Sequence, residues 1–270
     1  MQRIFISFIA FSFFLISCKK DSSTTYNSSV KADLSVEFDN IAGSQDLQLN
    51  TGKYITESGD TIKSITKLKY FVSNFSFTNM DGTVYTVPQD SSYFLVIEGD
   101  SSTYEPNFKV PEGEYKSVSF ILGVDSVRNT LDVSKRTGVL DVTSPATADM
   151  YWTWNSGYIF YKLEGTSPQV PSMGGMGGNN FYYHIGLFGG KTTSTINNIK
   201  KVTLDLTARG TPKVKSGKDT NIHLMVDVLK MFSGTNSISI AAHSMVMTDD
   251  YSANIAANFV GMFRHDHTEN

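Results

Sequence analysis

The feature that most constrains the fold is a repeated alternation of apolar and polar side chains along most of the chain. Between residues 34 and 38 (LSVEF) the two kinds alternate without a break. Successive side chains of a β-strand point to opposite faces, so this pattern is typical of a strand with one buried face. Similar alternation, or a continuous apolar run, predicts strands at residues 68–77, 93–97, 117–124, 159–163, 181–185, 202–206 and 222–228.

Turn residues separate the predicted strands. The pair Asp81-Gly82 follows the aromatic-rich strand 68–77 and is a strong hairpin signal, and residues 110–115 (VPEGEY) predict a second turn. Helical spacing of apolar residues is scarce, but residues 252–263 show it and predict one short helix. We therefore predict an all-β fold: a β-sandwich with long loops and at most short helices.

Two polar stretches, residues 125–148 and 164–180, are predicted to be long loops, which on a sandwich are either functional or disordered. The second contains the glycine-rich run 174–178, which no strand-to-helix junction surrounds, so it is not expected to bind phosphate. Its Met173 and Met176 offer thioethers, which suit Cu(I). Two exposed methionines in a mobile loop are the simpler interpretation.

The N-terminus has the form of a lipoprotein signal. A positively charged start at Arg3 precedes an apolar run, residues 4–16, that is too short to span a bilayer. The run closes in Leu15-Ile16-Ser17-Cys18, which resembles the lipobox of bacterial lipoproteins and contains the only cysteine. An ordinary signal peptide with an incidental cysteine is the alternative. We predict a signal peptide at residues 1–17, lipidation at Cys18, a tether at residues 18–31 and a β-sandwich domain at residues 32–270.

A lipidated Cys18 would place the protein at the cell envelope, held by acyl chains on the periplasmic or the surface face of a bacterial outer membrane. It would also leave no free thiol, which excludes disulfides, thiolate metal sites and a cysteine nucleophile. The formal net charge is -3 and no basic face is evident, so nucleic acid is not an expected partner. The sequence carries no Gly-x-Ser-x-Gly, His-Glu-x-x-His or dinucleotide-binding motif, so the chemistry of those enzyme classes is not expected.

Histidine is the residue type best suited to hold a metal in a chain without a thiol. On one predicted strand, His223 shares a polar face with Met225 and Asp227. His265 and His267 are two residues apart, so in an extended chain both imidazoles point to one side, with β-carbons about 7 Å apart. Such a pair can chelate a late transition metal. At each position a surface histidine without metal, or a solvated tail, is the alternative.

Both tryptophans lie in one short segment, residues 150–158 (MYWTWNSGY). On a strand, Trp152 and Trp154 would point to the same face. The chain has 13 tyrosines and 18 phenylalanines, so an aromatic packing cluster is the simplest interpretation of the pair.

The tryptophan segment also carries a family resemblance. Residues 150–165 (MYWTWNSGYIFYKLEG) resemble the signature of the MbnP-like copper-binding family, in a Bacteroidetes-type lipoprotein member. Further blocks resemble the family in the same order: residues 36–43, 68–75, 110–115, 120–124 and 183–186. They span most of the chain after the tether. Where many relatives carry a histidine after the Gly-Val block, this chain reads VRNT at residues 127–130.

The resemblance implies a β-rich envelope protein that binds copper, as Cu(I), through histidines beside an oxidised tryptophan. His184 lies in the family's His-Ile/Leu-Gly block and is the first ligand it implies, with His265 and His267 as further donors from the C-terminal segment. Either Trp152 or Trp154 would be converted to kynurenine. The oxidant would come from a di-haem peroxidase-like partner of the MbnH type, because the chain has no high-potential redox group of its own.

Three functions follow from these observations. The first is a copper-binding lipoprotein of the cell envelope that is a binder and not an enzyme. The second is a surface interaction or adhesion module without a metal, which would use aromatic loops to contact its partner. The third is an accessory of an oxidoreductase, whose relevant event is its own modification.

Overall fold

The computed structural model describes residues 25–152, 155–171 and 178–270. Within them the strands are β1 Lys31–Ala42, β2 Gln45–Asp46, β3 Tyr54–Ile55, β4 Thr61–Ile62, β5 Ser64–Asn79, β6 Val84–Thr86, β7 Tyr93–Ile97, β8 Asn107–Pro111, β9 Gly113–Leu122, β10 Ile159–Thr166, β11 Asn180–Gly186, β12 Lys200–Asp205, β13 Lys213–Val214, β14 Asn221–Asp227, β15 Met245–Val246 and β16 Phe263–Glu269. The α-helices are α1 Ser126–Thr130 and α2 Ser252–Asn258. The prediction of an all-β fold with short helices is confirmed.

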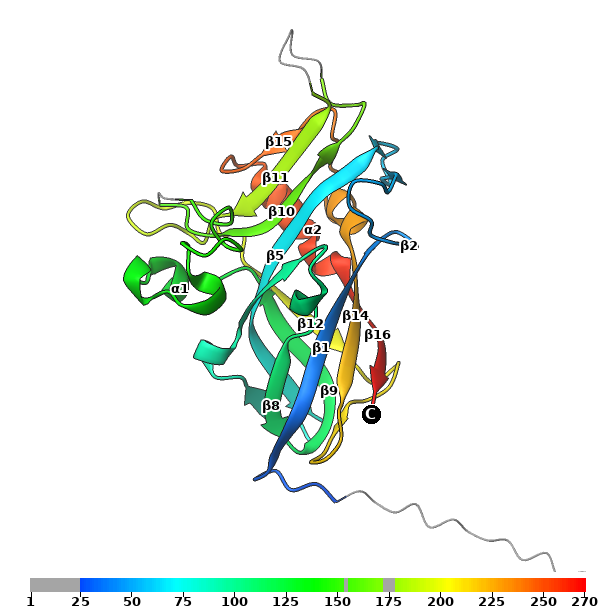
Figure 1. Ribbon diagram of the computed structural model, residues 1–270, viewed down its shortest axis with the longest axis vertical. Helices are drawn as coiled ribbons and strands as arrows, with labels where there is room; N and C mark the ends of the chain where they lie inside the picture. Colours follow the sequence, from blue (N-terminus) through cyan, green and yellow to red (C-terminus); the bar gives the residue numbers. More distant parts are fainter. Residues whose placement is uncertain (1–24, 153–154, 172–177) are drawn as a thin grey trace, which may run out of the picture.

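The strands form two large sheets (Figure 1). The five-stranded sheet has the order β16-β14-β1-β2, with β8 also paired to β1. The nine-stranded sheet has the order β12-β9-β5-β10-β11-β15, and β6, β7 and β13 pair with its members. Most pairs are antiparallel, but β1 and β14 run parallel side by side in the middle of the smaller sheet, so the first strand pairs with one far along the chain.

Aromatic side chains fill the space between the two sheets. Phe38 on β1 packs edge-to-face on Phe120 of β9, with ring centroids 5.6 Å apart, and Phe263 of β16 lies 5.2 Å from the same ring. All three belong to one buried cluster that draws side chains from both sheets. Edge-to-face pairs of this kind stabilise the fold by more than the burial of their apolar area alone would. The two sheets therefore pack face to face around this core, as in the predicted β-sandwich.

The insertion between β9 and β10 covers the other face of the nine-stranded sheet. Along β5, Tyr70 and Val72 belong to the central core, whereas Phe71 points the opposite way into a second buried cluster. Met150 and Tyr158 of the insertion complete that second cluster. The stretch 125–148 was predicted to be a loop, but part of it forms α1, where the Asp125 side chain caps the helix by accepting a hydrogen bond from the Arg128 backbone N–H.

The sequence-predicted strands all occur, with small shifts in their ends. The predicted helix is also present, as α2 followed by a 3-10 turn at Phe259–Met262. The strand β16 was not predicted, because its sequence FRHDHTE contains one apolar residue and no apolar alternation. No helix in the described part of the chain is long and apolar enough to cross a membrane. Cys18 and the signal segment lie outside the described residues.

Candidate metal-binding sites

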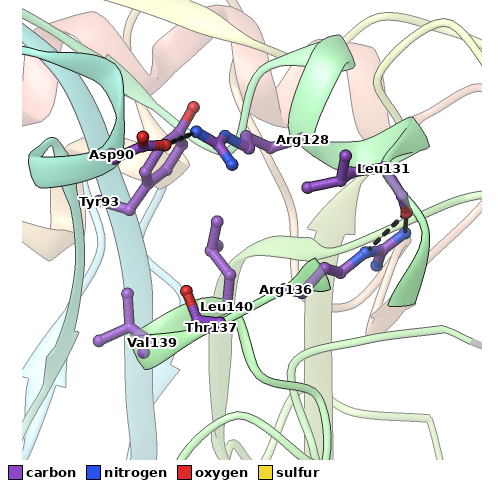
Figure 2. A pocket seen from close by; sticks show the side chains of 9 residues that line it. Asp90, Tyr93, Arg128, Leu131, Arg136, Thr137, Val139 and Leu140 are labelled. Carbon is purple, nitrogen blue, oxygen red and sulfur yellow. Dashed lines mark hydrogen bonds and ion pairs between the residues drawn. The ribbon is translucent and has the colours of Figure 1, made fainter. Parts of the chain in front are cut away.

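A small cavity of about 160 Å³ opens next to α1, between the insertion and the segment that contains Asp90 and Tyr93 (Figure 2). Two arginines dominate its walls: Arg128 forms an ion pair with Asp90, and Arg136 donates to the carbonyl oxygen of Leu131 at 2.9 and 3.1 Å. None of the lining residues is a histidine or a methionine. A cavity with guanidinium walls repels cations, so this one does not suit a metal.

His184 lies on β11, on the outer face of the nine-stranded sheet. Its strand neighbours Tyr183 and Ile185 point into the core, whereas the side chain of His184 points away from it. Its Nε2 lies 2.8 Å from Oε1 of Glu164. Burial and, after it, the positive charge of Lys162 lower the pKa of His184, although Glu164 opposes this. The imidazole is therefore neutral at pH 7, which is the form that binds metals.

Trp152 lies on the same face as His184. A Cβ added to Gly186 would fall 2.5 Å from Cζ3 of Trp152, so the indole ring lies directly against this glycine. Gly186 and His184 are two residues apart on one strand, so they share a face with their Cα atoms about 7 Å apart. The structure thus places the indole of Trp152 and the imidazole of His184 on the same face of this sheet. Trp154, Met173 and Met176 lie outside the described residues.

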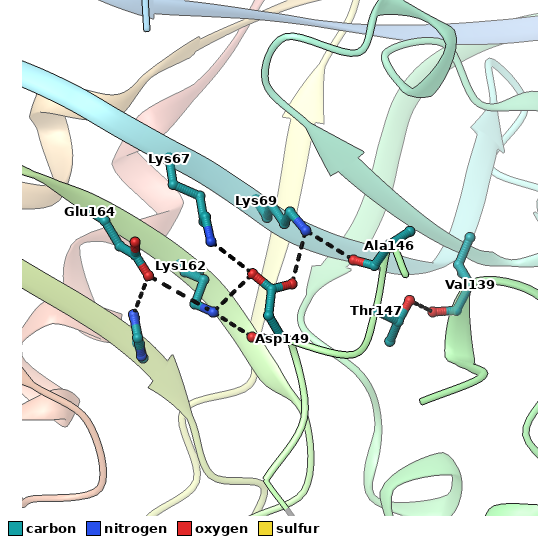
Figure 3. A network of polar contacts seen from close by, with 9 residues as sticks. Lys67, Lys69, Val139, Ala146, Thr147, Asp149, Lys162 and Glu164 are labelled. Atoms are coloured by element: carbon teal, nitrogen blue, oxygen red, sulfur yellow. Dashed lines mark hydrogen bonds and ion pairs between the residues drawn. The ribbon is translucent and has the colours of Figure 1, made fainter. Parts of the chain in front are cut away.

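A network of three lysines around Asp149 fixes the segment that leads to Trp152 (Figure 3). The Nζ atoms of Lys67, Lys69 and Lys162 lie 3.0, 2.9 and 3.2 Å from the carboxylate of Asp149. Burial alone would raise the pKa of Asp149, but hydrogen bonds from Lys69 and Lys67 and the charge of Lys162 outweigh it and hold this pKa well below its usual range. The insertion is therefore pinned to β5 and β10 by charge-assisted bonds.

A second group of histidines lies on the outer face of the five-stranded sheet. One ligand atom each from His223, Asp266 and His267 lies within 4.8 Å of the other two. The two imidazole rings are 4.7 Å apart between centroids. Oδ2 of Asp266 lies 3.0 Å from Nδ1 of His267 and 3.6 Å from Nδ1 of His223. The hydrogen bond to Asp266 raises the pKa of His267, and Asp266 itself has a lowered pKa for the same reason.

A β-bulge on β16 creates this group. His223 pairs with His267 and Leu224 pairs with His265, so Asp266 is the extra residue. A bulge turns two successive side chains toward the same region, which places Asp266 beside His267. His265 is instead only 7% exposed, with its Nε2 2.9 Å from the hydroxyl of Thr268. A regular strand would place His265 and His267 on the same face, as the sequence predicts, and the bulge is the reason that the structure separates them.

Sequence reasoning missed Asp266 and ranked His223 no higher than other histidines. The alternation had placed His223 on the polar face of its strand, and the burial pattern of β14 confirms that face. Its partner strand, however, could not be predicted from the sequence. The protein is thus a β-sandwich with candidate metal sites. Each of its two large sheets carries a histidine–carboxylate group on the outer surface, and the group on the nine-stranded sheet shares its face with a tryptophan ring.

The chain belongs to the MbnP family, because the family model for MbnP matches residues 31–249. Among solved structures, MbnP from Methylosinus trichosporium matches with a TM-score of 0.53 and 14% identity over 82% of each chain, which shows a shared fold. The search of curated proteins finds no match. The predicted family is therefore confirmed. The family match ends before α2 and β16, so it includes His184 but not Asp266 or His267.

Proposed function

We propose that the protein is an envelope protein that binds copper, as Cu(I), at a site on the outer face of the nine-stranded sheet. Membership of the MbnP family supports the copper-related function. The observation that carries the proposal is the position of the Trp152 ring against Gly186, on the same sheet face as His184, which is two residues away along β11. This is the pairing of histidine and tryptophan that the family resemblance implies.

His184 would supply an imidazole nitrogen to the ion. Cu(I) accepts two or three soft or borderline donors, and neutral imidazole is one of them. The bond between Nε2 and Glu164 orients the ring and leaves Nδ1 for the metal, in the way that carboxylates orient metal-binding histidines. A monovalent ion also tolerates the neighbouring Lys162 better than a divalent one would, because Coulomb repulsion scales with charge.

After oxidation to kynurenine, Trp152 would supply an aromatic amine and a ketone at the copper site. Trp154, outside the described residues, is the other candidate for this modification. The oxidant would be a di-haem peroxidase-like partner of the MbnH type, since the chain holds no redox group of its own. The protein itself binds copper and is not an enzyme, and Cys18 anchors it to the membrane. Membrane association should be lost in Cys18→Ala, and its retention would refute the anchor.

The test uses protein isolated from its native host and analysed for metal and intact mass. Replacement of one tryptophan carbon by oxygen adds about 4 Da. We expect this shift on one tryptophan of the native protein and its absence in recombinant protein made without the haem partner. Two unmodified tryptophans in cells that express the partner would refute the modification, and metal analysis without copper would refute the function.

A further inference from the structure

We propose that His223, Asp266 and His267 form a second metal site, which binds a divalent late transition ion such as Cu(II) or Zn(II). The site lies on the outer face of the five-stranded sheet and uses β14 and β16. It stands independently of copper binding at His184, because it shares no residue with that site.

The two sites are too far apart to hold one ion. His184 points outward from the nine-stranded sheet, whereas His223 points outward from the five-stranded sheet on the opposite side of the core. Packed sheets are about 10 Å apart, and outward side chains add to that distance. Bonds from zinc to its ligands measure only about 2 Å. His267 therefore serves a different ion from His184, although both were sequence-predicted copper ligands.

The two distances from Asp266 to the imidazoles are close to those around a small tetrahedral ion. With bonds of about 2.05 Å, a tetrahedral centre separates its ligand atoms by about 3.3 Å. The observed distances from Oδ2 of Asp266 are 3.0 Å to Nδ1 of His267 and 3.6 Å to Nδ1 of His223, one below this value and one above it. All three donor atoms lie within 4.8 Å of one another, so any longer separation would shorten through side-chain rotation when the donors surround one ion.

A second observation points to a missing partner at His223. Its Nδ1 is buried and, within the described part of the chain, has no hydrogen-bond partner, because Asp266 at 3.6 Å is too distant. A buried polar atom without a partner costs stability, which a metal at this position would restore. Asp39 of β1 lies 3.8 Å from Nε2, the other ring nitrogen, which is beyond hydrogen-bond distance but adds a second negative charge beside the site.

The donor set selects the class of ion. Two imidazoles suit copper and zinc, and the hard carboxylate favours a divalent ion over Cu(I). Met225 follows on the same face of β14, but its thioether already accepts a hydrogen bond from Arg264 at 2.6 Å. Three protein donors leave one position open to solvent, and His267, whose side chain is 47% exposed, gives the ion access.

The test titrates full-length recombinant protein carrying His184→Ala with CuSO4 and with ZnCl2, made without a haem partner so that the first site is absent. We expect one ion per chain. His223→Ala and His267→Ala should each weaken binding of both ions by at least about tenfold, and together they should abolish it. The electron paramagnetic resonance spectrum of the Cu(II) form should show two coupled nitrogens, and one in each single variant.

His243→Ala is the matched control, because that imidazole stacks on Tyr251 and belongs to neither site. It should leave affinity and spectrum unchanged. Thermal unfolding of each variant shows whether the fold survives, and the coupled-nitrogen count stays informative in variants with altered stability. Unchanged affinity in the double variant, or equal loss in His243→Ala, would overturn the proposal while leaving the proposal for His184 untouched.

Discussion

The two histidine regions place the same kind of pair, an imidazole and a carboxylate, in opposite electrostatic surroundings. Around His184 the nearby charges include Lys162 and Lys67, which help to lower its pKa. Around His223 and His267 they are mainly carboxylates, and His267 has a raised pKa. The difference teaches that identical ligand types can suit different ions: a positive setting disfavours divalent ions, and a negative one favours them.

The largest effect is expected from Gly186→Ala, which should disturb the region around His184 and leave the region around His223 unchanged. The new Cβ would fall 2.4 Å from the carbonyl oxygen of Tyr158 and 2.5 Å from the Trp152 ring. Overpacking of this kind costs about 3 kcal/mol of unfolding free energy. Denaturant unfolding would measure the loss. Binding of Zn(II) at His223 should be retained under folding conditions, and loss at both sites would show that the two regions are coupled.

A smaller loss of stability is expected from Asp149→Asn, about 2 kcal/mol, because the buried Lys162 would lose the nearer of its two carboxylates and keep only Glu164 at 3.9 Å. The pKa of Asp149 is lowered by folding, so its contribution is fully present above the unfolded value of about 3.9 and is lost as pH falls toward the folded value. The difference in unfolding free energy between wild type and variant should therefore shrink below pH 4. A difference that stays constant down to pH 2 would contradict this ion network.

Crossed histidine variants test the separation of the sites directly. His184→Ala should weaken Cu(I) binding by about tenfold, or about 1.4 kcal/mol, in competition with a chromophoric Cu(I) chelator. His223→Ala should leave that Cu(I) affinity unchanged while weakening Zn(II). If either variant alters both affinities, the histidines do not belong to two independent sites.

The smallest expected effect tests the difference in charge between the surroundings of His184 and those of His223 and His267. Lys67→Gln removes one positive charge near His184, so divalent Cu(II) should bind there about twofold more tightly, as expected for a partly exposed charge. The measurement is a Cu(II) titration of protein carrying His223→Ala and His267→Ala. Lys109→Gln, at an exposed ion pair with Asp33, is the control and should change nothing. A decrease in affinity would reverse the proposed sign.

The sequence predicted the strands well, because alternation is a local property of each segment. It could not predict the pairing of β14 with β16, since that depends on contacts between distant segments. The strand β16 escaped detection because five of its seven residues are charged residues or histidines, which alternate with nothing apolar.

For the candidate sites, too, individual residues could be predicted from the sequence but their grouping in space could not. His184 was found from the family block that contains it, and Trp152 from its own segment, but their proximity depends on how the insertion folds over Gly186. The group at His223 depends on one extra residue, Asp266, at a bulge. A bulge changes which side chains share a face and leaves no periodic signal in the sequence.

The parallel pairing of β1 with β14 has a consequence for when the protein can acquire a metal. Ser35 and Asn221, which are hydrogen bonded, are 186 positions apart, and β16 joins last along the chain. Contacts of such long sequence separation form late and slowly. The group on β14 and β16 therefore assembles only after β16 has been synthesised and the five-stranded sheet has folded, so an ion bound at the proposed site would report a folded domain.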